Sequence, residues 1–219
     1  MTEKNFWHGR GNTIGKTNHY LTMKKVLLII ALGLGMVQLS HAQSSEKLGG
    51  FGVRGGASLF NFGGDDASEN DYTNRVGFHV GGYAMLFMTD RLALEPGVYY
   101  SVKGTQNDDF VDSRAILNYV DVPVLFRLYP TNGFNVFAGP QISFLANSKF
   151  EGDFFGNTVS YDSDAIKETD FGVMMGVGYN LPKGFNVQAS YDLGLTPIFK
   201  DSDADVYNRG FKLSAGYTF

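Results

Sequence analysis

The feature that most constrains this chain is an alternation of apolar and polar residues that recurs eight times along it. In VDVPVLFRL (120–128), every second residue from Val120 to Leu128 is apolar, while Asp121 and Arg127 lie between them. A period of two residues is typical of a β-strand, because successive side chains of a strand point to opposite faces. The pattern therefore predicts strands that each have one apolar face and one polar, charged face.

The eight alternating segments are separated by connections of two kinds. Strands are predicted over 50–61, 76–88, 91–103, 118–130, 134–146, 170–180, 185–196 and 208–219, with no helix after residue 42. Short turns rich in Pro, Asn and Gly lie near Thr89, at PTNG (130–133) and at LPKG (181–184). The other connections are long, polar and acidic, at 62–75, 104–114, 147–169 and 197–207.

Short turns at one end and long loops at the other are the layout of an outer-membrane barrel. We therefore predict an all-β fold, an eight-stranded antiparallel up-and-down transmembrane β-barrel with periplasmic turns, extracellular loops and both termini in the periplasm. The alternative is a soluble lipocalin-like barrel or a sandwich, which would turn its apolar residues inward. The polar faces carry many small residues suited to a narrow lumen, and the apolar faces end in Tyr and Phe, which favours the membrane interpretation.

The N-terminal segment has the features of a signal peptide. Met23-Lys24-Lys25 is followed by an uncharged apolar run (26–39) and by Ser40-His41-Ala42, whose small residues fit a signal peptidase site. We expect a signal peptide over 23–42, cleavage after Ala42 and a barrel domain over 43–219. Residues 1–22 are then an over-extended start or an N-terminal extension, and Met23 is the expected initiator.

The predicted mature chain is acidic. Five of the 18 Lys and Arg residues and one of the 22 Asp and Glu residues precede Gln43, which leaves a formal charge of −8. Nucleic acid requires a basic surface, so we exclude it as a partner. The chain has no cysteine, so the fold must be stabilised without disulfides.

The polar faces carry charges of both signs, which a barrel would direct into its lumen. With eight strands, the interior is about wide enough for side chains to fill it. A buried charge without a partner is costly, so these charges are expected to pair with one another. Pro123 cannot donate a ladder hydrogen bond, and we expect it to mark a local bend or bulge. The predicted lumen charge network comprises Arg54, Glu95, Lys103, Asp121, Arg127, Asp192 and Lys212.

Several stretches resemble the Bacteroidetes outer-membrane β-barrel family that includes the PorT-like proteins. They are YVDVPVLFRLYP (119–130), FAGPQISFL (137–145), DFGVMMGVGYN (170–180), YDLGLTPI (191–198) and FKLSAGYTF (211–219). The resemblance implies that the barrel assembly machinery reads the terminal aromatic residues Tyr217 and Phe219. It also implies, as one alternative, an accessory role in type IX protein secretion.

Two further motifs match known binding signatures only in part. Gly50–Gly55 matches G-x-G-x-x-G, but a dinucleotide site needs a strand before it and a helix after it. Asp201, Asp203 and Asp205 resemble the start of a calcium loop, but Val206 and Lys212 stand where an EF-hand needs Gly and Glu. This leaves a solvated acidic rim, or a weak divalent-ion site shared with acidic residues of another loop, namely Asp65, Asp66, Glu69 and Asp71.

His79 and Ser101 raise the question of a lipid-modifying enzyme, because a Ser-His pair can act on acyl chains. The alternation directs both into the lumen, away from lipid, so we favour a hydrogen-bonded lumen histidine. We expect no catalytic residue, no cofactor and no metal.

Aromatic residues of the acidic loops are the remaining candidates for function. Aromatics within a polar rim often anchor a partner, and loop 147–169 is the best candidate; its contact residues are Phe150, Phe154, Phe155 and Tyr161. We predict a monomeric, non-enzymatic interaction protein that contacts outer-membrane lipid, the assembly machinery and an extracellular or secretion-system protein. A secretion accessory, a narrow pore and a lipid-modifying enzyme are the alternatives.

Overall fold

The computed structural model describes residues 47–65, 67, 73–107, 113–154, 157–162, 166–200 and 204–219. The strands are β1 (Lys47–Gly63), β2 (Thr73–Phe87), β3 (Leu92–Asn107), β4 (Ser113–Leu128), β5 (Phe134–Phe154), β6 (Asn157–Asp162), β7 (Thr169–Asn180), β8 (Phe185–Gly194) and β9 (Tyr207–Thr218). The short 3-10 helix η1 (Pro182–Gly184) precedes β8. The predicted signal peptide, residues 23–42, and residues 1–22 lie outside the described residues.

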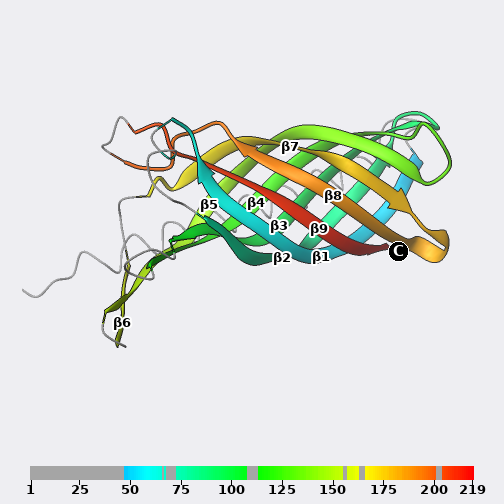
Figure 1. The fold of residues 1–219 in the computed structure, drawn as a ribbon. Coiled ribbons are helices and arrows are strands. Elements are labelled where there is room, and N and C mark those ends of the chain that lie inside the picture. Colours follow the sequence, from blue (N-terminus) through cyan, green and yellow to red (C-terminus); the bar gives the residue numbers. More distant parts are fainter. Residues whose placement is uncertain are drawn as a thin grey trace, which may run out of the picture. The chain divides into compact units, whose positions relative to one another are not determined.

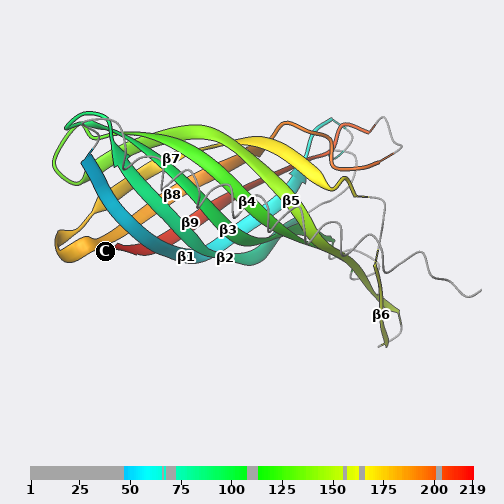
Figure 2. The same ribbon diagram turned by 180° about the vertical axis from the view of Figure 1, so that it is seen from behind.

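Eight of these strands form a closed antiparallel barrel (Figures 1 and 2). The strand order is β4-β3-β2-β1-β9-β8-β7-β5, and pairing of β4 with β5 closes the sheet. Each strand therefore lies beside its neighbours in the chain, apart from β6, which pairs with β5 alone. The predicted up-and-down barrel of eight strands is confirmed. Within the described residues, no helix is long and apolar enough to cross a membrane.

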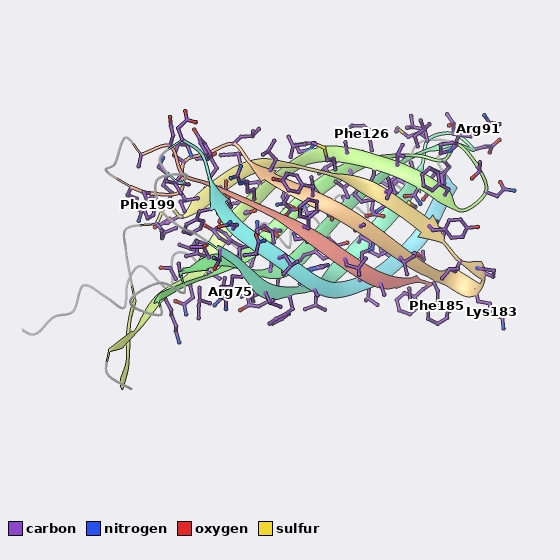
Figure 3. All side chains as sticks on the ribbon, viewed as in Figure 1. Arg75, Arg91, Phe126, Lys183, Phe185 and Phe199 are labelled. Atoms are coloured by element: carbon purple, nitrogen blue, oxygen red, sulfur yellow. The ribbon has the colours of Figure 1, made fainter. Side chains whose placement is uncertain are left out.

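The two faces of each strand meet opposite environments. Asp121 and Arg127 are at most 1% exposed, whereas Phe126 between them is 52% exposed. Phe126 and Phe185 stand on the outside of the barrel in Figure 3. Exposed apolar residues on this scale are unusual for a protein in water, and they match a barrel with lipid as its solvent. The outward apolar set includes Phe51, Val53, Leu59, Val76, Phe78, Val80, Leu128, Phe171, Met175, Val177, Val187, Leu193, Phe211 and Leu213.

The barrel has two unlike ends. We call the end with the connections near 88–91, 130–133 and 181–184 the turn end, and the opposite end the loop end. Apolar side chains are buried near both ends. Near the turn end they are Tyr83, Met85, Ala93, Tyr99 and Tyr129. Near the loop end they are Phe62, Ala67, Ala115, Leu117, Tyr119, Ile166, Ile198 and Val206.

The strands differ from the prediction at the loop end. Connection 104–114 was expected to be a loop, but β3 continues to Asn107 and β4 begins at Ser113. Connection 147–169 was also expected to be a loop, but β5 continues to Phe154 and pairs there with β6. Both segments were assigned to connections because they are rich in Asp, Asn, Ser and Gly, although apolar and polar residues alternate briefly over 150–154 and 158–161.

The bulge expected at Pro123 is absent. Pro123 pairs with Gln141 on β5, and the register on either side of it is continuous. The shift in this pair of strands lies instead between Asn118 and Tyr119. A proline removes one N–H donor, so it forfeits one ladder bond without changing the residue count of its strand.

Candidate functional site

The lumen contains a buried ion cluster near the turn end. Glu95 on β3 lies between Arg54 on β1 and Arg127 on β4, and the three residues form what we call the Glu95 cluster. Arg54 Nη1 donates to Glu95 Oε1 at 2.7 Å, and Arg127 Nε lies 2.6 Å from Oε2. Neutral side chains bond the rest of both guanidinium groups, namely Tyr99, Asn135, Asn186 and Gln188. With two cations and one anion, the cluster carries a formal charge of +1.

A second cluster lies nearer the loop end. Asp121 on β4 is fully buried between Lys103 Nζ, at 2.8 Å from Oδ1, and Lys212 Nζ, at 3.2 Å from Oδ2. Lys212 Nζ also contacts Asp192 Oδ2 at 2.7 Å. These four residues form the Asp121 cluster, which is neutral as a group. All seven residues of the predicted lumen charge network thus lie in one cluster or the other, and all seven are buried.

Aromatic rings face the cations inside the lumen, and two of them, Phe60 and Phe137, were not predicted from the sequence. The Arg54 guanidinium lies 4.0 Å from the centre of the Tyr83 ring, and that of Arg127 lies 4.3 Å from the Phe137 ring. Lys103 and Lys212 both lie 5.5 Å from the Phe60 ring. The alternation could have identified both rings as lumen-facing. Residues two apart in a strand lie on the same face, so Phe60 shares a face with Ser58, and Phe137 shares one with Asn135.

The remaining lumen motifs form no arrangement that could act on lipid. His79 Nε2 lies 2.8 Å from Ser214 Oγ, and His79 is the Cα partner of Ser101 across β2 and β3. All three residues are buried in the lumen, on the face opposite to the exposed apolar residues. Gly50–Gly55 lies within β1, so no helix follows this motif.

Most residues of the acidic rim lie outside the described part of the chain, namely Asp66, Glu69, Asp71, Asp201 and Asp203. Tyr207 Oη donates to Asp205 Oδ1 at 3.0 Å. Among the described residues, no three His, Cys, Asp or Glu side chains come together as metal ligands could.

Strands β5 and β6 form a hairpin that projects beyond the barrel wall at the loop end, as Figures 1 and 2 show. β7 pairs with β5 only as far as the pair Phe144–Thr169. Beyond this point β5 continues, paired with β4 as far as Gly152 and with β6 as far as Phe154. We call residues 147–162 the surface hairpin. Phe150 and Tyr161 are Cα partners across it, Phe154 ends β5, and Phe155 lies outside the described residues.

The predicted assembly residues lie at the turn end on the outer face. Tyr217 is 37% exposed and Phe219 is 77% exposed. Their ring centres are 5.2 Å apart, and the Tyr217 ring also contacts Phe185 at 5.1 Å. The Phe219 N–H donates to the Phe51 carbonyl at 2.7 Å, which joins the last residue to β1.

Comparisons with known proteins agree with this geometry. The family model of the outer membrane protein beta-barrel domain matches residues 29–219. The crystal structure of Neisserial surface protein A (NspA) has a similar fold, with a TM-score of 0.53 and 15% identity over 80% of this chain and 100% of that one. Ail, the attachment invasion locus protein of Yersinia pestis, also matches, with a TM-score of 0.48 and 17% identity over 78% of this chain and 99% of that one. No curated protein matches the chain.

Proposed function

Because this chain belongs to the outer membrane protein beta-barrel family, we propose that it is a non-enzymatic outer-membrane protein whose surface hairpin binds a partner. In the orientation we propose, the turn end and both termini face the periplasm and the loop end faces the exterior. Short turns on the periplasmic side and longer segments outside are the usual arrangement of such barrels.

One observation carries the proposal: the sheet continues past the barrel wall into the surface hairpin. Paired strands that extend beyond the barrel wall present a defined backbone edge, which favours a use for this segment. β6 has a strand on one side only among the described residues, so its other edge can accept an extended segment of a partner. The sequence of this segment also contains Phe150, Phe154, Phe155 and Tyr161, and aromatic residues are the kind that most often anchor a partner.

A shortened hairpin tests the proposal. Lys149 and Asp162 are Cα partners, so residues 150–161 can be replaced by Asn-Gly to give a two-residue turn. Affinity purification in mild detergent from native outer membrane should recover a partner with the full chain and lose it with the shortened chain. Secretion components among the recovered proteins would support the accessory role in type IX secretion.

A matched variant separates the two ways in which the hairpin could bind. Replacing Phe150, Phe154, Phe155 and Tyr161 with Ser keeps the length of the hairpin and removes its aromatic rings. Loss of the partner in this variant would assign binding to the side chains, and retention would assign it to the strand edge. Recovery of the same partner with the shortened chain would contradict the proposal.

The pore alternative receives less support from the lumen. Arg54, Lys103, Arg127 and Lys212 are at most 4% exposed, and apolar side chains are buried near each end of the barrel. A barrel of eight strands has room for side chains but little for a water channel.

The assembly signal leads to a separate prediction. Phe219→Ala removes the most exposed ring of the chain end but leaves the backbone bond from residue 219 to Phe51 in place. We therefore expect folded protein in the outer membrane to fall several-fold, while the purified variant refolds in detergent as the natural chain does. Quantifying both amounts tests this, with Phe185→Ala as a matched turn-end control. Equal losses in the two assays would mean that Phe219 acts through stability alone.

A further inference from the structure

A small cavity lies inside the lumen, between the Asp121 cluster and the loop end. It has a volume of about 10 Å³, enough for one water-sized occupant. Gly172 on β7 and Gly194 on β8 line it, and these two residues are directly opposed across the two strands. Neither has a side chain, so space remains where other lumen positions are filled.

The cavity is lined by donors such as Lys103 as well as by acceptors, but the donors are bound to other residues and the side-chain atoms of the lining left without a hydrogen bond are acceptors. Asp170 Oδ1, Asp192 Oδ1, Gln141 Oε1 and Asn208 Oδ1 accept no hydrogen bond from any residue that the structure describes. All four residues line the cavity, and each is at least 94% buried. Buried acceptors without donors are costly, so four around one space indicate an occupant that supplies positive charge or donors.

The charges nearby leave one carboxylate without an ionic partner. Lys103 Nζ is bound to Asp121 Oδ1 and to Ser143 Oγ, and Lys212 Nζ is bound to Asp121 Oδ2 and Asp192 Oδ2. Asp170 accepts a bond from Asn208 Nδ2 at 2.9 Å, but it forms no ion pair with a described residue. With Asp170 included, this end of the lumen holds three carboxylates and two ammonium groups, a local excess of one negative charge, while the Glu95 cluster nearer the turn end holds the excess positive charge.

We propose that the cavity is a binding site for one monovalent cation, with sodium as its test ion. Carboxylate and amide oxygens suit a hard cation, and a single charge balances the excess that Asp170 introduces. A divalent ion fits less well, because the lining offers only two carboxylates and one of them already binds Lys212. The ion would join β5, β7, β8 and β9 through their side chains and so stabilise the folded barrel.

Equilibrium unfolding in urea tests the site. The protein is refolded in zwitterionic detergent in sodium chloride or in choline chloride of the same ionic strength, and tyrosine near-UV circular dichroism follows unfolding. Sodium should raise the urea midpoint, by an amount that grows with the logarithm of its concentration above the dissociation constant. Asp170→Asn should abolish this rise, because the amide removes the excess charge.

Glu168→Gln is the matched control, since it makes the same change of charge two residues away on an exposed side chain. This variant should keep the full response to sodium. Equal midpoints of the natural protein in the two salts would overturn the proposal and leave water as the occupant. An equal sodium response in Asp170→Asn and Glu168→Gln would overturn it as well, because the effect would then arise at the surface. If Asp170→Asn does not refold, sodium-23 NMR relaxation of the natural protein tests the site instead. The absence of line broadening that depends on the protein would then overturn the proposal.

Discussion

Glu95→Gln is expected to lower the free energy of unfolding by about 3–5 kcal/mol. Glu95 is 1% exposed and is the only anion of its cluster, so the neutral amide leaves Arg54 and Arg127 buried without a counter-charge. The two guanidinium groups also face each other across the amide, and their repulsion is no longer balanced. Urea unfolding in lipid vesicles, followed by tyrosine circular dichroism, gives the difference directly.

Two controls separate this charge effect from packing. Glu168→Gln removes an exposed carboxylate and should change the free energy of unfolding by less than about 0.5 kcal/mol. The triple variant Arg54→Met, Glu95→Met, Arg127→Met removes the whole cluster, and it should recover much of the stability lost in Glu95→Gln. A loss below about 1 kcal/mol for Glu95→Gln would mean that water reaches the cluster.

Leu213→Arg is expected to cost about 2–4 kcal/mol in a bilayer. Leu213 lies in the middle of β9 and is 68% exposed, so its side chain meets whatever surrounds the barrel. In hydrocarbon an arginine loses its hydration, whereas in water the same substitution at an exposed site would have little effect. Unfolding free energies in lipid vesicles measure the change.

Leu181→Arg provides the depth control. Leu181 is 44% exposed in the turn before β8, where an arginine can reach the headgroups and should cost about 0–1 kcal/mol. Equal costs at residues 181 and 213 would contradict a lipid-facing band with its centre near Leu213.

The sequence predicted the barrel wall well because the wall is where physical constraint is strongest. Lipid outside and a polar lumen inside impose opposite requirements on neighbouring residues, so Asp121 and Phe126 were assigned to the correct faces. The surface hairpin was taken for a loop because its many Asp, Asn, Ser and Gly residues are typical of a connection, and the alternation over 150–154 and 158–161 is too short to predict strands by itself. The bulge expected as one possibility at Pro123 is absent, because a missing N–H donor removes one ladder bond without shifting the register.

The sequence predicted which residues face the lumen better than it predicted which of them contact one another. The alternation identifies inward residues, but it does not say that Arg54 shares Glu95 with Arg127 while Lys103 and Lys212 share Asp121. Those pairings depend on how strands far apart in sequence face each other across the barrel. The buried side chains near the loop end were missed for a related reason, since Ile166 and Ile198 come from connections that carry no periodic pattern.

The ion pairs also bear on the order in which the barrel forms. Arg54, Glu95 and Arg127 belong to β1, β3 and β4, so the Glu95 cluster can assemble within the first half of the chain. Asp121 on β4 must wait for Lys212 on β9, which is the last strand made. In an open sheet Lys212 already has Asp192 on the adjacent strand β8, and Asp121 already has Lys103 on the adjacent strand β3, so of these ion pairs only the one between Lys212 and Asp121 forms when the two halves meet. Closure therefore adds one shared carboxylate that links the first half of the chain to the second, a stabilising contact that a half-closed barrel lacks.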